Sequence, residues 1–196
     1  MAFEPMTGVG RKELAVERFA IKDLIAWKNS PRRRPLLVQG ARQVGKTWLI
    51  REFGQTHFAA VAYVNFLEDE AMARQFEGEL APARLLDAVT LYTGVNAKDP
   101  NTLVVFDEIQ ECPRALTSLK SFAERSPETA LVAAGSLLGV ALHRGVSFPV
   151  GKVDHLLIYP LSFDEFLLAT GNNLMLDTLR RGDLALADSL SERYIE

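Results

Sequence analysis

Cysteine and histidine are scarce in this chain, and their scarcity excludes several kinds of site. The 196 residues include a single cysteine, Cys112, and three histidines. One cysteine cannot build an internal disulfide framework or a cysteine-rich zinc site. The histidines, His57, His143 and His155, are too scattered for metal-ligand spacing. We also find no Ser-His-Asp or Cys-His pattern for nucleophilic catalysis.

Strong charge and long apolar runs are lacking too. The net charge is −3, so no global basic field draws the chain onto nucleic acid. No apolar run approaches the roughly 18 residues of a membrane-spanning helix. Residues 1–10 do not contain a basic region followed by an apolar region, as a signal peptide would. We therefore expect a cytoplasmic globular protein that does not enter a membrane. The length suits one domain, or one domain and the start of another.

The alternation of apolar runs with helical patterns predicts an α/β fold. Because strands and helices alternate, we expect βαβ units and a mainly parallel sheet, and the unbroken apolar runs fit a sheet covered on both faces. Ser162 with Glu165 three residues later predicts a capped helix start, and Gly54 predicts a helix end. The expected strands are 36–38, 61–66, 103–106, 130–134 and 155–159, and the expected helices are one or two within 12–29, then 46–53, 70–76, 82–92, 113–125, 162–169, 174–179 and 184–194.

The strongest motif is a glycine-containing segment between the first expected strand and the next helix. Residues 40–47, Gly-Ala-Arg-Gln-Val-Gly-Lys-Thr, match the P-loop pattern G-x-x-x-x-G-K-S/T. Glycines let the backbone wrap a phosphate, and the helix N-terminus favours an anion. Lys46 is expected to reach the β- and γ-phosphates, and the Thr47 hydroxyl to ligate Mg²⁺. The alternative is a glycine-containing turn with a solvated lysine. Such a turn would not require a strand directly before it and a helix directly after it, and this segment has both. The residues expected to bind the nucleotide are Gly40, Ala41, Arg42, Gln43, Val44, Gly45, Lys46, Thr47 and Trp48.

Two adjacent acids follow the third expected strand. A carboxylate at the carboxyl end of a buried parallel strand lies where ligands bind in such sheets. Asp107 is placed to hold Mg²⁺, and Glu108 to polarise an attacking water. The alternative is a helix cap or a solvated acidic turn. The P-loop upstream favours the catalytic interpretation.

Three further features stay open on the sequence alone. Ser136, at the end of the fourth expected strand, either contacts the γ-phosphate or caps the next helix. The arginines at 32–34 contact nucleic acid or a partner, or form a solvated loop, which we favour. Among His143, Arg144 and Lys152, one basic residue is a candidate for stabilising transition-state charge, in the same chain or across a subunit interface.

Four motifs together resemble a family of prokaryotic AAA-type ATPases. They are residues 40–47, Phe-Asp-Glu-Ile-Gln at 106–110, Ala-Gly-Ser at 134–136 and Tyr-Pro-Leu-Ser-Phe-Asp-Glu-Phe at 159–166, in the family's order over about residues 15–170. The resemblance implies a three-layer P-loop fold of the additional-strand (ASCE) type, with a five-stranded sheet of order 5-1-4-3-2. It also implies that Ser136 senses the γ-phosphate. Lys152 stands where the family usually has arginine, whose forked contact a lysine cannot make.

The expected organisation is an N-terminal helical segment at 1–30, an ATPase core at 31–161 and the start of a C-terminal helical region at 162–196, of lid or winged-helix type. The family usually continues into a nuclease-like domain. Because the sequence stops inside a helical pattern, we interpret it as an N-terminal fragment or a truncated product. The expected ligands are ATP and ADP. DNA or another protein is expected to bind through the missing regions, and a homo-oligomer stays open.

The predicted function is Mg²⁺-dependent ATP hydrolysis that drives or regulates a partner, or a C-terminal domain acting on nucleic acid. Lys46, Glu108 and Ser136 are the expected catalytic residues, and Thr47 and Asp107 the expected Mg²⁺ ligands. One alternative is an ATP-dependent switch without hydrolysis, which would not need Glu108. Another is a small-molecule kinase, which would need an arginine-rich lid. The chain lacks an Asn-Lys-x-Asp guanine motif, which favours adenine.

Overall fold

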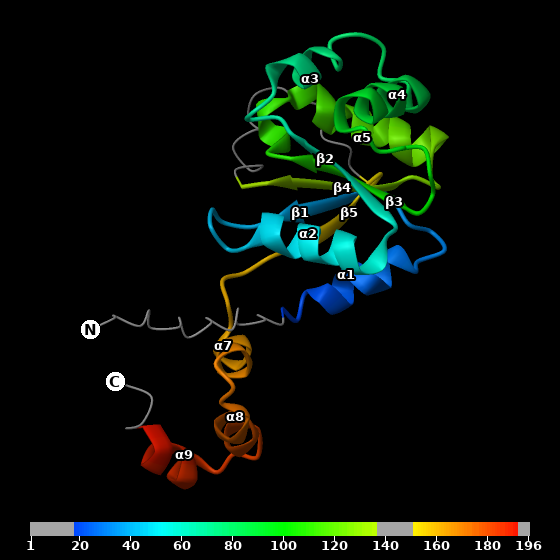
Figure 1. Cartoon of the computed structure of the whole chain (residues 1–196). Coiled ribbons are helices and arrows are strands. Elements are labelled where there is room, and N and C mark those ends of the chain that lie inside the picture. The colour runs from blue at the N-terminus through cyan, green and yellow to red at the C-terminus, as the bar shows by residue number, and fades with distance from the viewer. Residues whose placement is uncertain (1–17, 137–150, 192–196) are drawn as a thin grey trace, which may run out of the picture. The chain divides into compact units, whose positions relative to one another are not determined.

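A computed structural model of the chain describes residues 18–136 and 151–191 (Figure 1). The expected basic residues His143 and Arg144, and the expected helical residues 12–17 and 192–194, lie outside these ranges. The chain forms two compact units, one of Phe19–Pro160 and one that contains Arg18 and the residues from Leu161 onward. No helix in the described ranges combines the length and the apolar character that a membrane crossing requires.

The larger unit is built on a five-stranded sheet in which all neighbouring strands are parallel. The strand order is β2-β3-β4-β1-β5, which confirms the order that the family resemblance implied. Since all strands run the same way, the ends of β1, β3 and β4 meet at one edge, where ligands bind in such sheets. The strands are β1 (Leu36–Gln39), β2 (Ala60–Asn65), β3 (Thr102–Asp107), β4 (Ala130–Gly135) and β5 (Asp154–Leu157).

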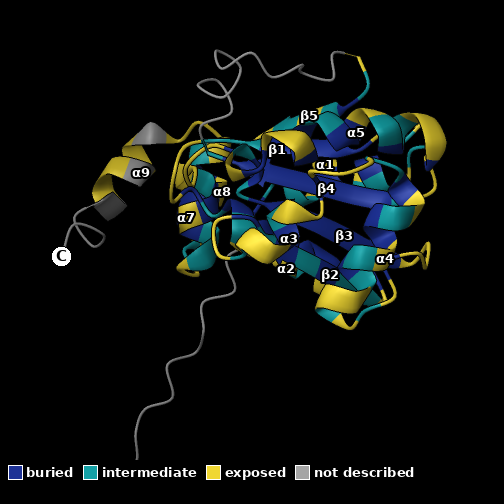
Figure 2. Ribbon diagram, turned by 90° about the horizontal axis from the view of Figure 1, so that it is seen from above, coloured by how far each residue is buried: buried dark blue, intermediate teal, exposed yellow. Residues whose placement is uncertain are grey.

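Helices cover both faces of this sheet, which confirms the three-layer arrangement (Figures 1 and 2). Side chains alternate between the faces along each strand. On β3, Leu103 and Val105 pack with α1 (Ile21–Lys28) and α2 (Lys46–His57). Val104 and Phe106 face the other way, toward α3 (Glu70–Arg74), α4 (Pro82–Thr93) and α5 (Pro113–Arg125). The same alternation places Asp107 on the side of α2.

Gly54 does not end a helix, and this prediction was wrong. Helix α2 continues through it to His57. A Cβ atom at Gly54 would lie 2.6 Å from Val61 Cγ2 and 3.1 Å from Leu103 Cδ2. The glycine therefore lets the helix approach β2 and β3 closely. Two other elements end earlier than expected: α3 ends at Arg74 and β5 ends at Leu157.

The smaller unit contains α7 (Phe163–Ala169), α8 (Asn173–Arg180) and α9 (Leu184–Ser191). The start of α7 is the expected cap: Ser162 Oγ accepts from the Glu165 backbone N–H, and Glu165 Oε2 accepts from the Ser162 N–H at 2.8 Å. The other carboxylate oxygen of Glu165 pairs with Arg18 Nε at 3.2 Å, and both side chains are buried. Glu165 thus ties residue 18 to the first turn of α7.

Candidate nucleotide-binding site

The loop between β1 and α2 has a backbone that requires glycine at defined places. A Cβ atom at Gly40 would overlap the carbonyl oxygen of Ile158 and lie 3.2 Å from Val44 Cγ2. Gly45 has a φ of 87°, in the left-handed region, directly before the first residue of α2. Gln43 also lies in this region, with a φ of 62°. The chain can therefore wrap tightly around the N-terminus of α2, where unpaired N–H groups favour an anion.

Lys46 holds this loop closed from inside. Its Nζ donates to the carbonyl oxygens of Gly40 at 3.0 Å and Ala41 at 2.7 Å, and the residue is only 7% exposed. Burial lowers the pKa of the Lys46 ammonium, while the nearby carboxylates of Glu108 and Asp107 raise it and partly offset that effect. A cation in this position is available to phosphate oxygens bound in the loop.

Thr47 and Asp107, the two expected Mg²⁺ ligands, lie in direct contact. Thr47 Oγ1 donates to Asp107 Oδ2 at 2.8 Å, and Asp107 is 3% exposed. The Glu108 N–H donates to the other carboxylate oxygen, Oδ1, at 2.9 Å. A hydroxyl and a carboxylate form the all-oxygen donor set that Mg²⁺ prefers, so these residues fit the ion.

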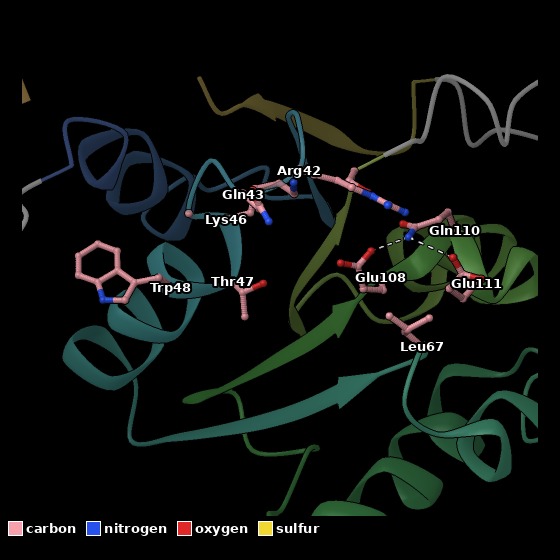
Figure 3. A pocket seen from close by; sticks show the side chains of 11 residues that line it. Arg42, Gln43, Lys46, Thr47, Trp48, Leu67, Glu108, Gln110 and Glu111 are labelled. Carbon is pink, nitrogen blue, oxygen red and sulfur yellow. Dashed lines mark hydrogen bonds between the residues drawn. The ribbon is translucent and has the colours of Figure 1, made fainter. Parts of the chain in front are cut away.

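Glu108 sits at a strained backbone position at the end of β3. Its φ of 49° and ψ of 44° are left-handed, which for a residue with a side chain costs about 1–3 kcal/mol. It precedes a short helix, η1 (Ile109–Glu111), from which Gln110 Nε2 donates to Glu108 Oε2 at 2.5 Å (Figure 3). The carboxylate must receive the amide N–H, so the Gln110 carbonyl oxygen points elsewhere. That oxygen, Oε1, is buried without a partner.

Ser136 follows β4 at the same edge of the sheet. Its Oγ is also buried without a partner. The alternative prediction for Ser136 was a cap of the next helix. That prediction depends on residues 137–150, which lie outside the described ranges. Within the part of the chain that the structure describes, three buried side-chain polar atoms lack partners, and two of them belong to Gln110 and Ser136. Such atoms are rare because they cost free energy, and both of these residues line one pocket.

This pocket has a volume of about 490 Å³. Figure 3 shows the Arg42 side chain extending from the loop toward Gln110, and the Trp48 ring on the opposite side from the acids. Three of the expected nucleotide-binding residues, Gly40, Ala41 and Val44, do not line it, and the Val44 side chain is buried in the core beneath the loop. The lining residues are Arg42, Gln43, Gly45, Lys46, Thr47, Trp48, Leu67, Glu108, Gln110, Glu111 and Ser136.

Tyr63 on β2 joins the site although no motif contains it. Its hydroxyl donates to Asp107 Oδ2 at 2.6 Å, and the Arg51 guanidinium lies 4.4 Å from the centre of its ring. Burial and the bond to Asp107 raise the pKa of Tyr63 above its usual range. The signal for this contact was the strand order, since β2 is the neighbour of β3.

Lys152 and the arginine run lie away from this pocket. Lys152 precedes β5, at the edge where the strands begin, and pairs with Glu124 on α5 at 3.1 Å. It therefore does not contact the P-loop of its own chain. Arg33 donates to the Glu128 carbonyl and Arg34 to the Gly151 carbonyl, both at 2.7 Å. The favoured prediction of a solvated loop agrees with the structure, because the segment is a loop in which Arg34 is exposed and Arg33 partly exposed. Both arginines also hold distant backbone segments through these hydrogen bonds.

Comparisons with known proteins found similar solved structures and one family model. The chain is similar to a solved Walker-type ATPase of Pyrococcus abyssi, with 16% identity, a TM-score of 0.52 and coverage of 95% of this chain. The chain spans 66% of that protein's length. It is also similar to C. elegans PCH-2, with 16% identity, a TM-score of 0.40 and coverage of 83% of this chain and 46% of that one. No curated protein matches the sequence. A family model described as an AAA domain matches residues 32–167, more than half of the chain, and the chain therefore belongs to this AAA family.

Proposed function

We propose that the chain binds ATP and hydrolyses it in the presence of Mg²⁺. The observation that carries this proposal is the convergence of Lys46, Thr47, Glu108 and Ser136 around one pocket, from the start of α2 and the ends of β3 and β4. A phosphate loop alone would support binding only. The acid beside Asp107 adds a general base for water, which hydrolysis requires.

Each residue has a separate role in this proposal. Lys46 and the N–H groups of the loop hold the phosphates. Thr47 and Asp107 would hold Mg²⁺, which when bound offsets the negative charge of the phosphate oxygens. Glu108 accepts a proton from the attacking water, and Ser136 donates its unpartnered hydroxyl to the γ-phosphate.

Two loop residues are assigned to other parts of the nucleotide. Trp48 is 46% exposed and lies across from the acids (Figure 3), so we assign it to the base or the sugar. A flat aromatic side chain suits a base, whichever base it is. Arg42 extends toward Gln110, which supports a role beside the outer phosphates. Adenine is preferred because the guanine motif is lacking.

Two substitutions and a matched control test this proposal. Glu108→Gln should abolish turnover while ATP binding survives, and Lys46→Ala should weaken binding itself. Glu79→Gln is the control, because Glu79 is exposed and does not line this pocket. The measurements are phosphate release and ATP affinity by calorimetry. Normal turnover in Glu108→Gln would remove Glu108 from the mechanism.

A switch without hydrolysis is the second candidate. The observation that favours it is the Gln110 bond, which occupies one Glu108 oxygen while the backbone is strained. Single-turnover hydrolysis by the purified chain separates the two functions, because a switch would leave bound ATP intact. A kinase gains no support: of the late arginines, Arg180 pairs with Asp164 at 3.3 Å and Arg181 donates to the Asp177 carbonyl.

We also propose that ATP use serves a partner, or a further domain that acts on nucleic acid, and that copies of the chain associate. This rests on the family resemblance, since the solved Pyrococcus abyssi relative is longer than this chain. The test measures hydrolysis and particle mass with and without DNA. Identical rates and a constant monomer mass under both conditions would contradict it.

A further inference from the structure

The hydrogen bond between Tyr63 and Asp107 links an unassigned residue to the proposed Mg²⁺ site. Tyr63 lies on β2, opposite Val105 of β3 in the parallel register, and Asp107 follows Val105 by two residues. Residues two apart on a strand point to the same face, so Tyr63 and Asp107 both face α2. The fold therefore brings the tyrosine hydroxyl within 2.6 Å of Asp107 Oδ2.

The Asp107 carboxylate depends on its donors because it is buried. A carboxylate removed from water is stable only if hydrogen bonds replace its hydration. Oδ2 receives the hydroxyls of Thr47 and Tyr63, and Oδ1 receives the Glu108 N–H. Thr47 is itself a proposed ligand, and the Glu108 donor belongs to the strained backbone. Of the three donors, Tyr63 is thus the side chain that can fix the carboxylate without binding the ion.

Arg51 holds the tyrosine in place from the other side. It lies on α2, one turn after Thr47, with its guanidinium 4.4 Å from the centre of the Tyr63 ring. A cation at this distance from an aromatic face is attracted to it. The helix that carries Thr47 therefore also positions Tyr63, and both hydroxyls reach the same oxygen.

From this arrangement we infer that Tyr63 is a positioning residue of the Mg²⁺ site, acting through Asp107. The inference rests on the proposed function, because it assigns Tyr63 to the metal-dependent part of nucleotide binding. Groups that orient a metal ligand typically change metal affinity by about 10–100-fold when removed. Tyr63 should therefore raise the gain in nucleotide affinity that Mg²⁺ provides, and leave the metal-free affinity unchanged.

The test compares Tyr63→Phe with Tyr92→Phe in the full chain. Phenylalanine keeps the ring that packs against α2 and removes only the hydroxyl. Tyr92 is the matched control, because its hydroxyl also bonds an aspartate, Asp69, outside the pocket. Calorimetry with a slowly hydrolysed ATP analogue, in Mg²⁺ and in EDTA, gives the affinity gain due to the metal. We expect Tyr63→Phe to reduce this gain about tenfold and Tyr92→Phe to leave it unchanged.

The outcomes separate this inference from the proposed function. If the natural chain gains no affinity from Mg²⁺, the proposed metal-dependent function fails and the inference falls with it. If the natural chain shows the gain and Tyr63→Phe keeps it within twofold, only the inference is overturned. A cycle with Asp107→Asn adds a second criterion. Tyr63→Phe should have no further effect once Asp107 is changed, and an additive loss would mean that Tyr63 acts elsewhere.

Discussion

Replacing Gly40 with alanine should damage both the stability of the larger unit and its nucleotide binding. The new methyl group would overlap the backbone carbonyl of Ile158, and Val44 Cγ2 lies only 3.2 Å away. Neither neighbour can move freely, because the Ile158 N–H donates to the Gln39 carbonyl at 2.7 Å and Val44 is buried. The strain must therefore pass into the loop or into the end of β5.

Two costs add up at this position. Overpacking a filled site costs about 1–3 kcal/mol. The φ of Gly40, 158°, is rarely adopted by residues with a side chain, and such backbone strain costs about 1–3 kcal/mol. The free energy of unfolding should fall by about 2–6 kcal/mol, which is a large part of the roughly 5–15 kcal/mol of a typical domain. Bound phosphate should also be lost, since the loop cannot close around it.

Gly94→Ala provides the matched control. Gly94 ends α4 with a φ of 72°, and a Cβ atom there would meet nothing within 4 Å. Only the left-handed backbone conformation of the new alanine is unfavourable there, by about 1–2 kcal/mol. Urea unfolding, followed by the combined fluorescence of Trp27, which is buried, and Trp48, compares the two variants. The reasoning is refuted if Gly40→Ala is no less stable than Gly94→Ala, or if it binds ATP with unchanged affinity.

Two other predictions concern residues near the site. Gln110→Ala should lower kcat about tenfold at unchanged ATP affinity, because a hydrogen bond to a charged group is worth about 1.5–3 kcal/mol and here orients Glu108. Gln55→Ala, on the exposed side of α2, is its control, and a loss confined to affinity would count against the assignment. Burial raises the pKa of the Cys112 thiol, so at pH 8 the reactive thiolate is scarcer than in the unfolded chain. Labelling by iodoacetamide should therefore accelerate in urea together with unfolding, and fast labelling in buffer would contradict this.

The motifs located the site because each is local in sequence. A strand, a glycine loop and a helix start are contiguous at residues 36–47, and Asp107 with Glu108 directly follows an apolar strand. Their meeting requires only that the strands run parallel, which the alternation of strands and helices predicted. The order of the strands came from the family resemblance, because periodicity carries no information on which strands are neighbours.

The features that sequence reasoning missed depend on contacts between distant segments. In the sequence, Tyr63 is indistinguishable from any other strand residue. Its contact with Asp107 becomes evident only when β2 is known to pair with β3. Gly54 fits a helix end as well as a close helix–strand contact, and only the nearby Val61 side chain decides. Arg33 donates a hydrogen bond to a carbonyl 95 residues away, and no local sequence pattern predicts so distant an acceptor. The location of Lys152 could have been predicted from the sequence. A residue that directly precedes a parallel strand lies at the edge of the sheet opposite the phosphate loop.

The neighbours of β1 set the order in which the protein can fold as it is synthesised. Leu36 pairs with Val132 on one side and with Asp154 on the other, and β1 precedes the other four strands of this sheet. Such distant pairings are slow to form because a long loop must close first. During synthesis, the phosphate loop would leave the ribosome long before the strands that support it. The Ile158 carbonyl, which limits the space at Gly40, emerges only after β5, so the phosphate loop precedes β5 in synthesis and reaches its final structure after it.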